Sequence, residues 1–232
     1  MWNGKMKAVT FSYDDGVVYD RRLVGIFNKY GLKCTFNLNS GVMSGASFWE
    51  NGGVEIHRMN AAGLPELYRG HEIAAHCLTH ADLTSCDDET VRNEILLDRE
   101  NLERMFGCSV EGMAYPYGAF SDSVVDIVRE CGIKYARTTR STCGAATPSG
   151  LLTLSAAMHH GDEHAYDYIR DFLSLDPAAM TEPKMLYIWG HSYEFEVNHN
   201  WDYIEEICRL LSGREDIFYG TNREVLSPFH GR

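Results

Sequence analysis

The sequence lacks the features that define several other classes of protein. No apolar run approaches the length of about 18 residues that a membrane-spanning helix needs. Its first residues lead straight into a predicted strand, whereas a secretory signal has a basic segment followed by an apolar one. No Gly-x-Gly-x-x-Gly, P-loop or Gly-x-Ser-x-Gly motif occurs, so nucleotide-binding and serine-hydrolase functions lack support. We therefore predict a cytoplasmic location and no membrane partner.

Charge and cysteine usage exclude two further classes. The chain has 21 Lys and Arg against 33 Asp and Glu, a net charge of 21 − 33 = −12, without a clustered acidic tail. Because Lys and Arg hold the phosphate backbone, this balance predicts no nucleic-acid partner. The 7 cysteines are scattered, odd in number and form no Cys-x-x-Cys. That pattern favours free thiols in a reducing compartment over a disulfide framework.

Strand-like and helix-like segments alternate along the chain. Strands are predicted at 7–12, 33–38, 71–76, 110–115, 133–138, 151–156, 185–190 and 216–219, and helices at 18–30, 61–69, 87–106, 121–131, 163–174 and 200–212. This alternation predicts an α/β fold with parallel strands and right-handed crossovers. No Pro- or Ser-rich linker divides the chain, so we predict one domain over residues 1–232. The Gly/Ser-rich stretch 40–60 is predicted to be a functional rim loop.

Polar residues fall where the predicted strands end. They lie at or just beyond the C-terminal end of a strand: Asp14, Asp15, His76, His80, Tyr117, Gly118, Arg137 and His191. In parallel α/β folds these strand ends converge on one face, where active sites form. Unrelated surface residues would not coincide in this way. We therefore expect one site built from several strands.

Two of these residues have the spacing of metal ligands. His76 and His80 are four apart, so they face the same side on either a helix or a strand. A carboxylate from another strand end would complete a His₂–carboxylate set with an open position, which is typical of a catalytic metal site. Asp14 and Asp15 are adjacent and point in opposite directions on an extended backbone. One can then bind metal while the other faces the substrate water; the alternative is an Asx turn before Gly16.

Four segments resemble the motifs of polysaccharide deacetylases of the NodB-homology type, carbohydrate esterase family 4. Residues 10–16, Thr-Phe-Ser-Tyr-Asp-Asp-Gly, are similar to the family's Thr-Phe-Asp-Asp-Gly with two residues between Phe and Asp. Residues 76–80, His-Cys-Leu-Thr-His, resemble His-(Ser/Thr)-x-x-His with Cys in place of the hydroxyl residue. Residues 114–118, Ala-Tyr-Pro-Tyr-Gly, resemble Arg-x-Pro-Tyr-Gly, and residues 189–191 resemble a late strand that ends in His.

The resemblance implies a fold and a cofactor. The fold is a distorted (β/α) barrel with six to eight mostly parallel strands and a sugar groove. The cofactor is a divalent metal, most often zinc, with cobalt, nickel or manganese as alternatives. By resemblance Asp15, His76 and His80 bind this metal.

The resemblance also implies catalytic roles. Asp14 would be the general base and His191 the general acid, while the peptide N–H of Tyr117 would stabilise the oxyanion. Aromatic rings pack against sugar faces, and Trp49 or Tyr193 could do so here. Substrate contacts are expected from Tyr115, Pro116, Trp189 and Tyr193.

The chain departs from the family pattern in two places. The family's third-motif Arg is Ala114 here. We hypothesise that Arg137, at the end of the next strand, replaces that guanidinium and keeps Asp14 ionised; the alternative is an Arg exposed at a strand end. The family's fourth motif, an aspartate that tunes the acidic histidine, is not evident, and Asp162 is the nearest candidate.

These observations favour a metal-dependent hydrolase that removes an acetyl group from an N-acetylated sugar or glycan, acting on an amide bond that is not a peptide bond. One alternative keeps the metal site and changes the substrate, to a cyclic amide or to an acetyl ester. Another is a catalytically idle glycan-binding domain. Asp14 and His191 argue against that reading, because a binding module needs neither a base nor an acid. The oligomeric state is not predicted.

Overall fold

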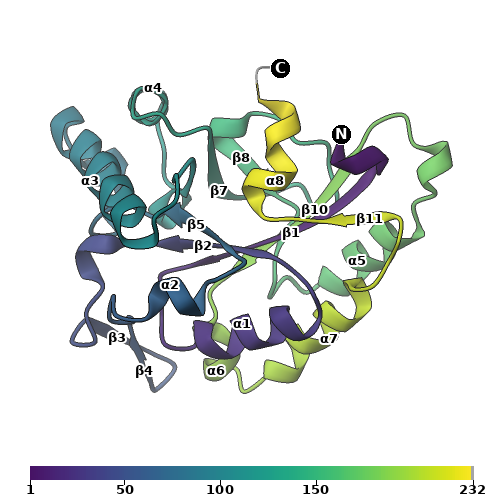
Figure 1. Cartoon of the computed structure of the whole chain (residues 1–232), viewed down its shortest axis with the longest axis horizontal. Helices are drawn as coiled ribbons and strands as arrows, with labels where there is room; N and C mark the ends of the chain where they lie inside the picture. The colour runs from purple at the N-terminus through teal and green to yellow at the C-terminus, as the bar shows by residue number, and fades with distance from the viewer. Residues whose placement is uncertain (231–232) are drawn as a thin grey trace.

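One mostly parallel sheet organises the chain (Figure 1). The structure, a computed structural model, describes residues 1–230. Eight strands follow the order β8-β7-β6-β5-β2-β1-β10-β9, and β11 pairs with β1 outside that path, all in parallel. The bounds are β1 Lys7–Asp14, β2 Cys34–Leu38, β5 Glu72–Ala75, β6 Gly112–Ala114, β7 Tyr135–Ser141, β8 Leu154–Ala156, β9 Met158–His159, β10 Lys184–Gly190 and β11 Ile217–Tyr219. The predicted fold class is confirmed.

The two ends of the strand path meet. β8 pairs with β7, and β9 pairs with β10. A single residue, Ala157, separates β8 from β9, and its N–H donates to the carbonyl of Tyr187 in β10 at 2.8 Å. Because the first and last strands of the path are consecutive in sequence, the sheet curves into a distorted barrel.

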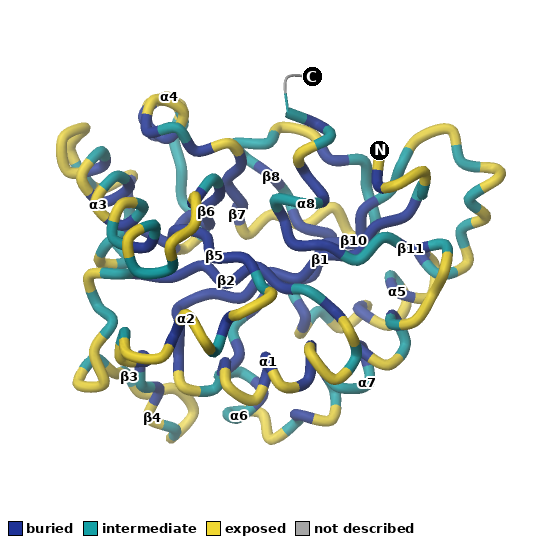
Figure 2. The backbone as a smooth tube through the Cα atoms, viewed as in Figure 1, coloured by how far each residue is buried: buried dark blue, intermediate teal, exposed yellow. Residues whose placement is uncertain are grey.

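Helices surround this sheet, with their exposed faces outward (Figure 2). Their bounds are α1 Asp20–Lys29, α2 Leu64–Leu67, α3 Asp88–Phe106, α4 Asp122–Glu130, α5 Ala165–Ser174, α6 Tyr193–Val197, α7 Trp201–Leu211 and α8 Asn222–Leu226. The sequence prediction located all but α6 and α8, which are 5 residues long each. In the longest helix, α3, the Asp87 side chain accepts from the Thr90 N–H, and Gly107 ends the helix with φ 64°. No helix among residues 1–230 is long and apolar enough to cross a membrane.

The stretch 40–60 contains regular structure that the sequence did not predict. It forms an antiparallel hairpin of β3 Phe48–Asn51 and β4 Val54–His57. Gly52 and Gly53 connect the strands, both with positive φ (57° and 78°), as a two-residue hairpin turn requires. The prediction of a loop was wrong because the strands are short and largely exposed, so their composition resembles that of a loop.

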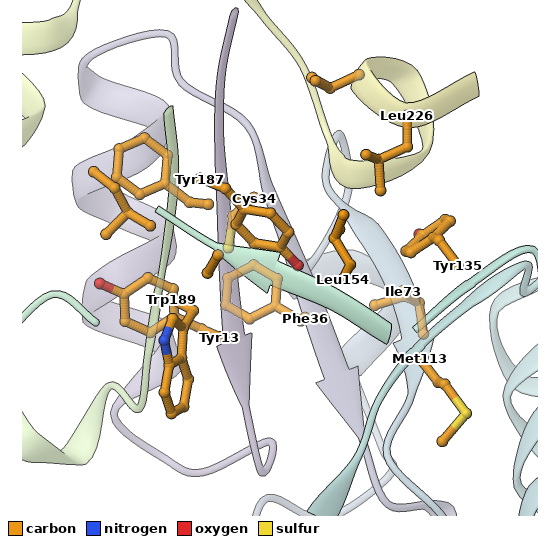
Figure 3. Close-up of a cluster of buried hydrophobic side chains, with 14 of the residues drawn as sticks. Tyr13, Cys34, Phe36, Ile73, Met113, Tyr135, Leu154, Tyr187, Trp189 and Leu226 are labelled. Carbon is orange, nitrogen blue, oxygen red and sulfur yellow. The ribbon is translucent and has the colours of Figure 1, made fainter. Parts of the chain in front are cut away.

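The twofold alternation of strand residues gives the barrel a polar interior and an apolar exterior. On β1, all of whose residues are buried, Ser12 and Asp14 both accept hydrogen bonds from Asn37 of β2. The intervening Phe11 and Tyr13 pack against Phe27 of α1, with ring centroids 4.8 and 5.8 Å apart. Figure 3 shows side chains of neighbouring strands and of α8 gathered in one buried cluster.

The end of the barrel at the strand N-termini is closed by hydrogen bonds to α8. The buried carboxylate of Glu72 accepts from the Thr35 hydroxyl at 2.8 Å, from the Tyr135 hydroxyl, and from the Arg223 N–H at 2.9 Å. Asn222 donates to the Tyr187 hydroxyl at 2.7 Å. These contacts connect four strands to one short helix at the end opposite the polar residues predicted from the strand C-termini.

Candidate active site

A pocket of about 430 Å³ opens at the C-terminal ends of the strands. Its lining residues come from strands and the loops that follow them, from the hairpin and its base, and from the start of α6: Asp14, Asp15, Trp49, Arg58, His76, His80, Tyr115, Tyr117, Thr139, Trp189, His191 and Tyr193. Of the predicted site residues, Pro116 and Arg137 do not line the pocket and are both buried. The other predicted residues therefore meet in one place, as parallel strand ends require.

Three of these side chains form a set that could hold a metal ion. Asp15, His76 and His80 each offer one ligand atom, and these atoms lie within 4.8 Å of one another. His76 Nδ1 hydrogen-bonds the carbonyl of Ala114 at 2.7 Å, so Nδ1 carries the proton and the Nε2 lone pair is free. His80 Nε2 lies 3.5 Å from Asp15 Oδ1. A carboxylate and two imidazoles facing a pocket fit the donor set of a catalytic divalent cation.

The two imidazoles are in the form that ligates metals. Burial lowers the pKa of His76 to about 4, against the opposing charge of Asp14. Burial also lowers the pKa of His80, which is partly exposed. Both rings are therefore neutral near pH 7 and have a lone pair available for a cation.

The backbone adopts left-handed conformations around this set. Asp15, His80 and Tyr117 have φ of 81°, 63° and 58°, a region that residues other than Gly seldom occupy. The Asp15 N–H donates to the Asn37 carbonyl at 3.0 Å, and Arg58 Nη1 donates to the Asp15 carbonyl at 2.9 Å. The extended backbone thus ends at Asp14, and the left-handed turn at Asp15 brings both carboxylates to the same pocket. The prediction that they point in opposite directions was wrong, because Asp15 does not continue the strand.

Asp14 is buried beside the three candidate metal ligands and forms an ion pair with the guanidinium of Arg137. Its Oδ2 accepts from Arg137 Nη2, and its Oδ1 accepts from Asn37 at 2.7 Å. Burial opposes ionisation of Asp14, but Arg137, His76 and His191 outweigh it and lower the pKa to about 2. Asp14 is therefore an ionised carboxylate at neutral pH.

His191 faces both aspartates. Its Nε2 lies 4.0 Å from Asp14 Oδ2 and 3.9 Å from Asp15 Oδ2, while Nδ1 hydrogen-bonds Glu194 Oε1 at 3.3 Å. Burial disfavours the imidazolium, but the Glu194 hydrogen bond and the charges of Asp15 and Asp14 raise the pKa to about 9. The protonated imidazole of His191 and the ionised carboxylate of Asp14 therefore line the same pocket.

Comparison with known proteins identifies the family. The sequence model of the family described as polysaccharide deacetylase matches residues 3–136, more than half of the chain. The chain belongs to this family. The match spans three of the four motif segments, from the aspartates through residues 114–118.

One curated protein and two solved structures show distant similarity to this polysaccharide deacetylase family member. The uncharacterized protein YlxY of Bacillus subtilis (strain 168) is 25% identical over 115 residues, which cover 50% of this chain and 32% of that one. The chain thus spans about a third of that curated relative's length. The chitin deacetylase of the fungal pathogen Colletotrichum lindemuthianum superimposes with a TM-score of 0.61 at 16% identity, covering 95% of this chain and 87% of that one. A carbohydrate esterase family 4 pseudoenzyme from Bacillus anthracis gives 0.55 at 18% identity, covering 97% and 66%. At these identities the superpositions show a shared fold.

A guanidinium from the neighbouring strand contacts Asp14 where the third-motif Arg is absent. Ala114, at the motif position, pairs in register with Arg137 on the neighbouring strand β7. The Arg137 guanidinium reaches Asp14 and stacks over the Trp189 ring, 4.3 Å from its centroid. The side chain is 1% exposed, so the alternative of an Arg exposed at a strand end is wrong.

Glu194 contacts three histidines, a role that was not predicted from the sequence. Besides His191, its carboxylate contacts Nε2 of His159 at 3.1 Å and of His160 at 2.9 Å. Burial opposes ionisation of Glu194, but hydrogen bonds from the three imidazoles hold its pKa well below the usual range. Asp162, the earlier candidate, instead accepts from the His164 N–H at 2.9 Å. An acid three residues after His191 was the available signal, but it depends on helix α6, which was not predicted.

His159, His191 and Glu194 are also close enough to hold a cation. However, His159 Nδ1 accepts from the Gly161 N–H at 3.1 Å, so the proton of this ring is on Nε2, facing Glu194. A protonated nitrogen cannot ligate a metal. This group is therefore a hydrogen-bond network that orients His191.

Proposed function

We propose that the protein is a metal-dependent hydrolase that removes an acetyl group from an N-acetylated sugar or glycan. The observation that carries the proposal is the convergence of the Asp15, His76 and His80 ligand atoms within 4.8 Å, with Asp14 and His191 beside them. Membership of the polysaccharide deacetylase family supports the reaction class.

Asp15, His76 and His80 would hold the divalent metal, zinc first, with cobalt, nickel or manganese as alternatives. When bound, such a cation polarises the acetyl carbonyl and lowers the pKa of water towards about 7. The Nδ1 hydrogen bond from His76 to Ala114 fixes the ring so that Nε2 stays directed at the site.

Two side chains of the protein, Asp14 as base and His191 as acid, would carry out the proton transfers. Asp14, ionised through its contact with Arg137, accepts a proton from the attacking water. His191, oriented through Nδ1 by Glu194, donates a proton from Nε2 to the departing amine. Because the two groups begin in opposite protonation states, each is ready for its step at neutral pH.

The pocket walls would orient the acetyl group and the sugar. The peptide N–H of Tyr117, in a turn with φ 58°, would donate to the developing oxyanion, an interaction worth about 3 kcal/mol. Tyr115, Trp189 and Tyr193 line the pocket and would contact the sugar. Pro116, predicted to touch substrate, is instead the buried first residue of this turn and does not line the pocket.

The test begins with the metal content of the purified protein. Loading with zinc is expected to give one ion per chain, and acetate release is expected to stop on chelation and return with zinc. A panel of N-acetylglucosamine oligomers, acetylated xylan and cyclic ureides separates the amide, ester and cyclic-amide alternatives. Sugar binding without acetate release from any substrate would favour the idle glycan-binding domain. His57→Ala is a matched control, since His57 lies outside the pocket.

Three predictions accompany this function and remain predictions. They are a single domain over residues 1–232, a cytoplasmic location, and the absence of nucleic-acid and membrane partners.

A further inference from the structure

The hairpin β3–β4 contributes directly to the pocket. Trp49 of β3 and Arg58, the residue after β4, both line it. The Arg58 guanidinium stacks on the Trp49 ring, 5.0 Å from its centroid. Phe48, the preceding residue, lies on the opposite face of the strand, where it is 55% exposed and stacks on His57. One face of the hairpin is therefore turned to the site and the other to solvent.

The base of the hairpin is bonded to the loop that follows β1. Val17 and Arg58 form an antiparallel bridge, and the Val18 N–H donates to the His57 carbonyl at 3.0 Å. The Met59 N–H donates to the Gly16 carbonyl at 2.9 Å. These bonds place the hairpin immediately beside the Asp14–Asp15 turn.

The tip of the hairpin is packed against α6. A side chain at Gly52 would approach Val197 Cγ1 to 2.6 Å, so the turn lies directly on this helix. The Trp49 and Tyr193 rings meet edge to face with centroids 5.5 Å apart. Figure 1 shows β3 and β4 at the lower edge of the molecule, toward α6. The hairpin therefore spans from the loop after β1 to the helix after β10.

This span closes one side of the pocket. The wall consists of Arg58, Trp49 and Tyr193, and Trp49 in the middle contacts both of the others. On the β6–β7 side the lining residues are Tyr117 and Thr139, and Tyr117 is 67% exposed. The pocket volume of about 430 Å³ falls in the range of sites for small ligands, roughly 300–1,000 Å³. A chain lying across the site needs two open sides, and here one is blocked.

We propose that the hairpin restricts the substrate to a short N-acetylated sugar or to the terminal residue of a glycan, whose chain leaves the pocket past Tyr117. The proposal rests on the proposed deacetylase function and adds the position of the reacting sugar. Trp49 and Tyr193 would be the specificity-determining residues, because their edge-to-face contact joins the hairpin to α6 and both rings line the pocket on that side.

The experiment uses the zinc-loaded full chain and the monomer, dimer and hexamer of N-acetylglucosamine. Sequencing of the products by mass spectrometry locates each lost acetyl group. We expect terminal residues to react faster than internal ones by at least about tenfold, since a blocked pocket discriminates at that level. Combined Trp49→Ala and Tyr193→Ala substitutions are expected to reduce the ratio several-fold, while Phe48→Ala leaves it unchanged.

The possible results distinguish a failure of this inference from a failure of the proposed deacetylase function. Acetate lost equally from internal and terminal residues overturns the inference and leaves the deacetylase function standing. An unchanged ratio in the double variant also overturns it. Trp49→Phe is expected to retain the terminal preference, which excludes a general loss of hairpin structure as the cause. No acetate from any substrate, with zinc bound, overturns the proposed function and this inference together.

Discussion

The two ends of the barrel each contain a buried carboxylate, and the two carboxylates behave in opposite ways. Asp14 at the strand C-termini is 3% exposed, and Glu72 at the N-termini is 6% exposed. Burial disfavours ionisation of both. The Arg137 guanidinium nevertheless lowers the pKa of Asp14 to about 2, whereas burial of Glu72 prevails and raises its pKa. Glu72 is bonded by two hydroxyls and a peptide N–H, with Arg223 Nε 3.5 Å away and partly exposed.

The difference shows how one fold separates stability from chemistry. At the Glu72 end, side chains of the strands and α8 direct their polar atoms at one another, which closes the barrel. At the Asp14 end, His76 and His80 line a pocket instead, and the Nε2 lone pair of His76 is free. Polar groups that hydrogen-bond one another stabilise the fold. Polar groups that line a pocket are free to bind a ligand and react.

Replacing Asp14 by Asn should have the largest effect on activity. The substitution removes the proton acceptor, so acetate release is expected to fall by about 10²- to 10⁴-fold. Zinc content should remain at one ion per chain, because Asp14 is not in the ligand set. The measurements are acetate release and metal analysis on protein whose circular dichroism matches the unsubstituted chain. Activity within tenfold of the original would remove Asp14 from the mechanism.

Replacing Arg137 by Ala should reduce both stability and activity. It leaves the Asp14 carboxylate buried without its partner, which typically costs about 3–5 kcal/mol of unfolding free energy. Urea unfolding and acetate release measure the two effects. Arg137→Lys, which keeps the charge but not the planar fork, should recover part of each. Full activity in Arg137→Ala would refute the role of this residue as the replacement guanidinium.

Replacing Glu72 by Gln tests the other end of the barrel. The carboxylate of Glu72 accepts hydrogen bonds from Thr35 and from the Arg223 N–H, whereas Gln has only one acceptor oxygen and adds an NH₂ donor. We therefore expect the unfolding free energy to fall by about 1–3 kcal/mol. Acetate release per folded molecule should be unchanged, because Glu72 does not line the pocket. A fall in activity comparable to that of Asp14→Asn would show that the two ends are not separate.

A third buried carboxylate, Asp20, should make stability depend on pH. It accepts from Tyr68 at 2.7 Å and from Ser192 at 2.5 Å; burial, with the charges of Asp15 and Asp14, raises its pKa to about 7. The folded chain then keeps a proton that the unfolded chain releases above its ordinary pKa of 3.8. Stability from this group is present at low pH and is lost as pH rises through about 7.

Asp20→Asn should remove this dependence. As pH rises from 5 to 8, the melting temperature of the variant should increase by a few degrees relative to that of the parent. Thermal unfolding of both proteins at each pH measures it. A difference that does not change with pH would show that Asp20 is ionised throughout.

Much of the fold was predictable because its signals are local. Buried strands such as residues 7–12 read as short apolar runs, and helix 87–106 has a capping Asp and a terminal Gly. The short helix α6 and the hairpin β3–β4 have no such signals, since each is stabilised by packing on other elements. The contact of Glu194 with His191 was not predicted for the same reason, because it depends on α6.

The sequence by itself determined which chemical groups stand at the ends of strands, and therefore that Asp15, His76 and His80 share a site with Asp14 and His191. Strand periodicity and parallel pairing are short-range rules, so residue order is enough to apply them. The tertiary structure decided which cation pairs with Asp14, which acid orients His191, and that a hairpin closes one side of the pocket. These depend on inter-strand register and on contacts between distant segments, such as Ala114 with Arg137, which the linear order does not encode locally.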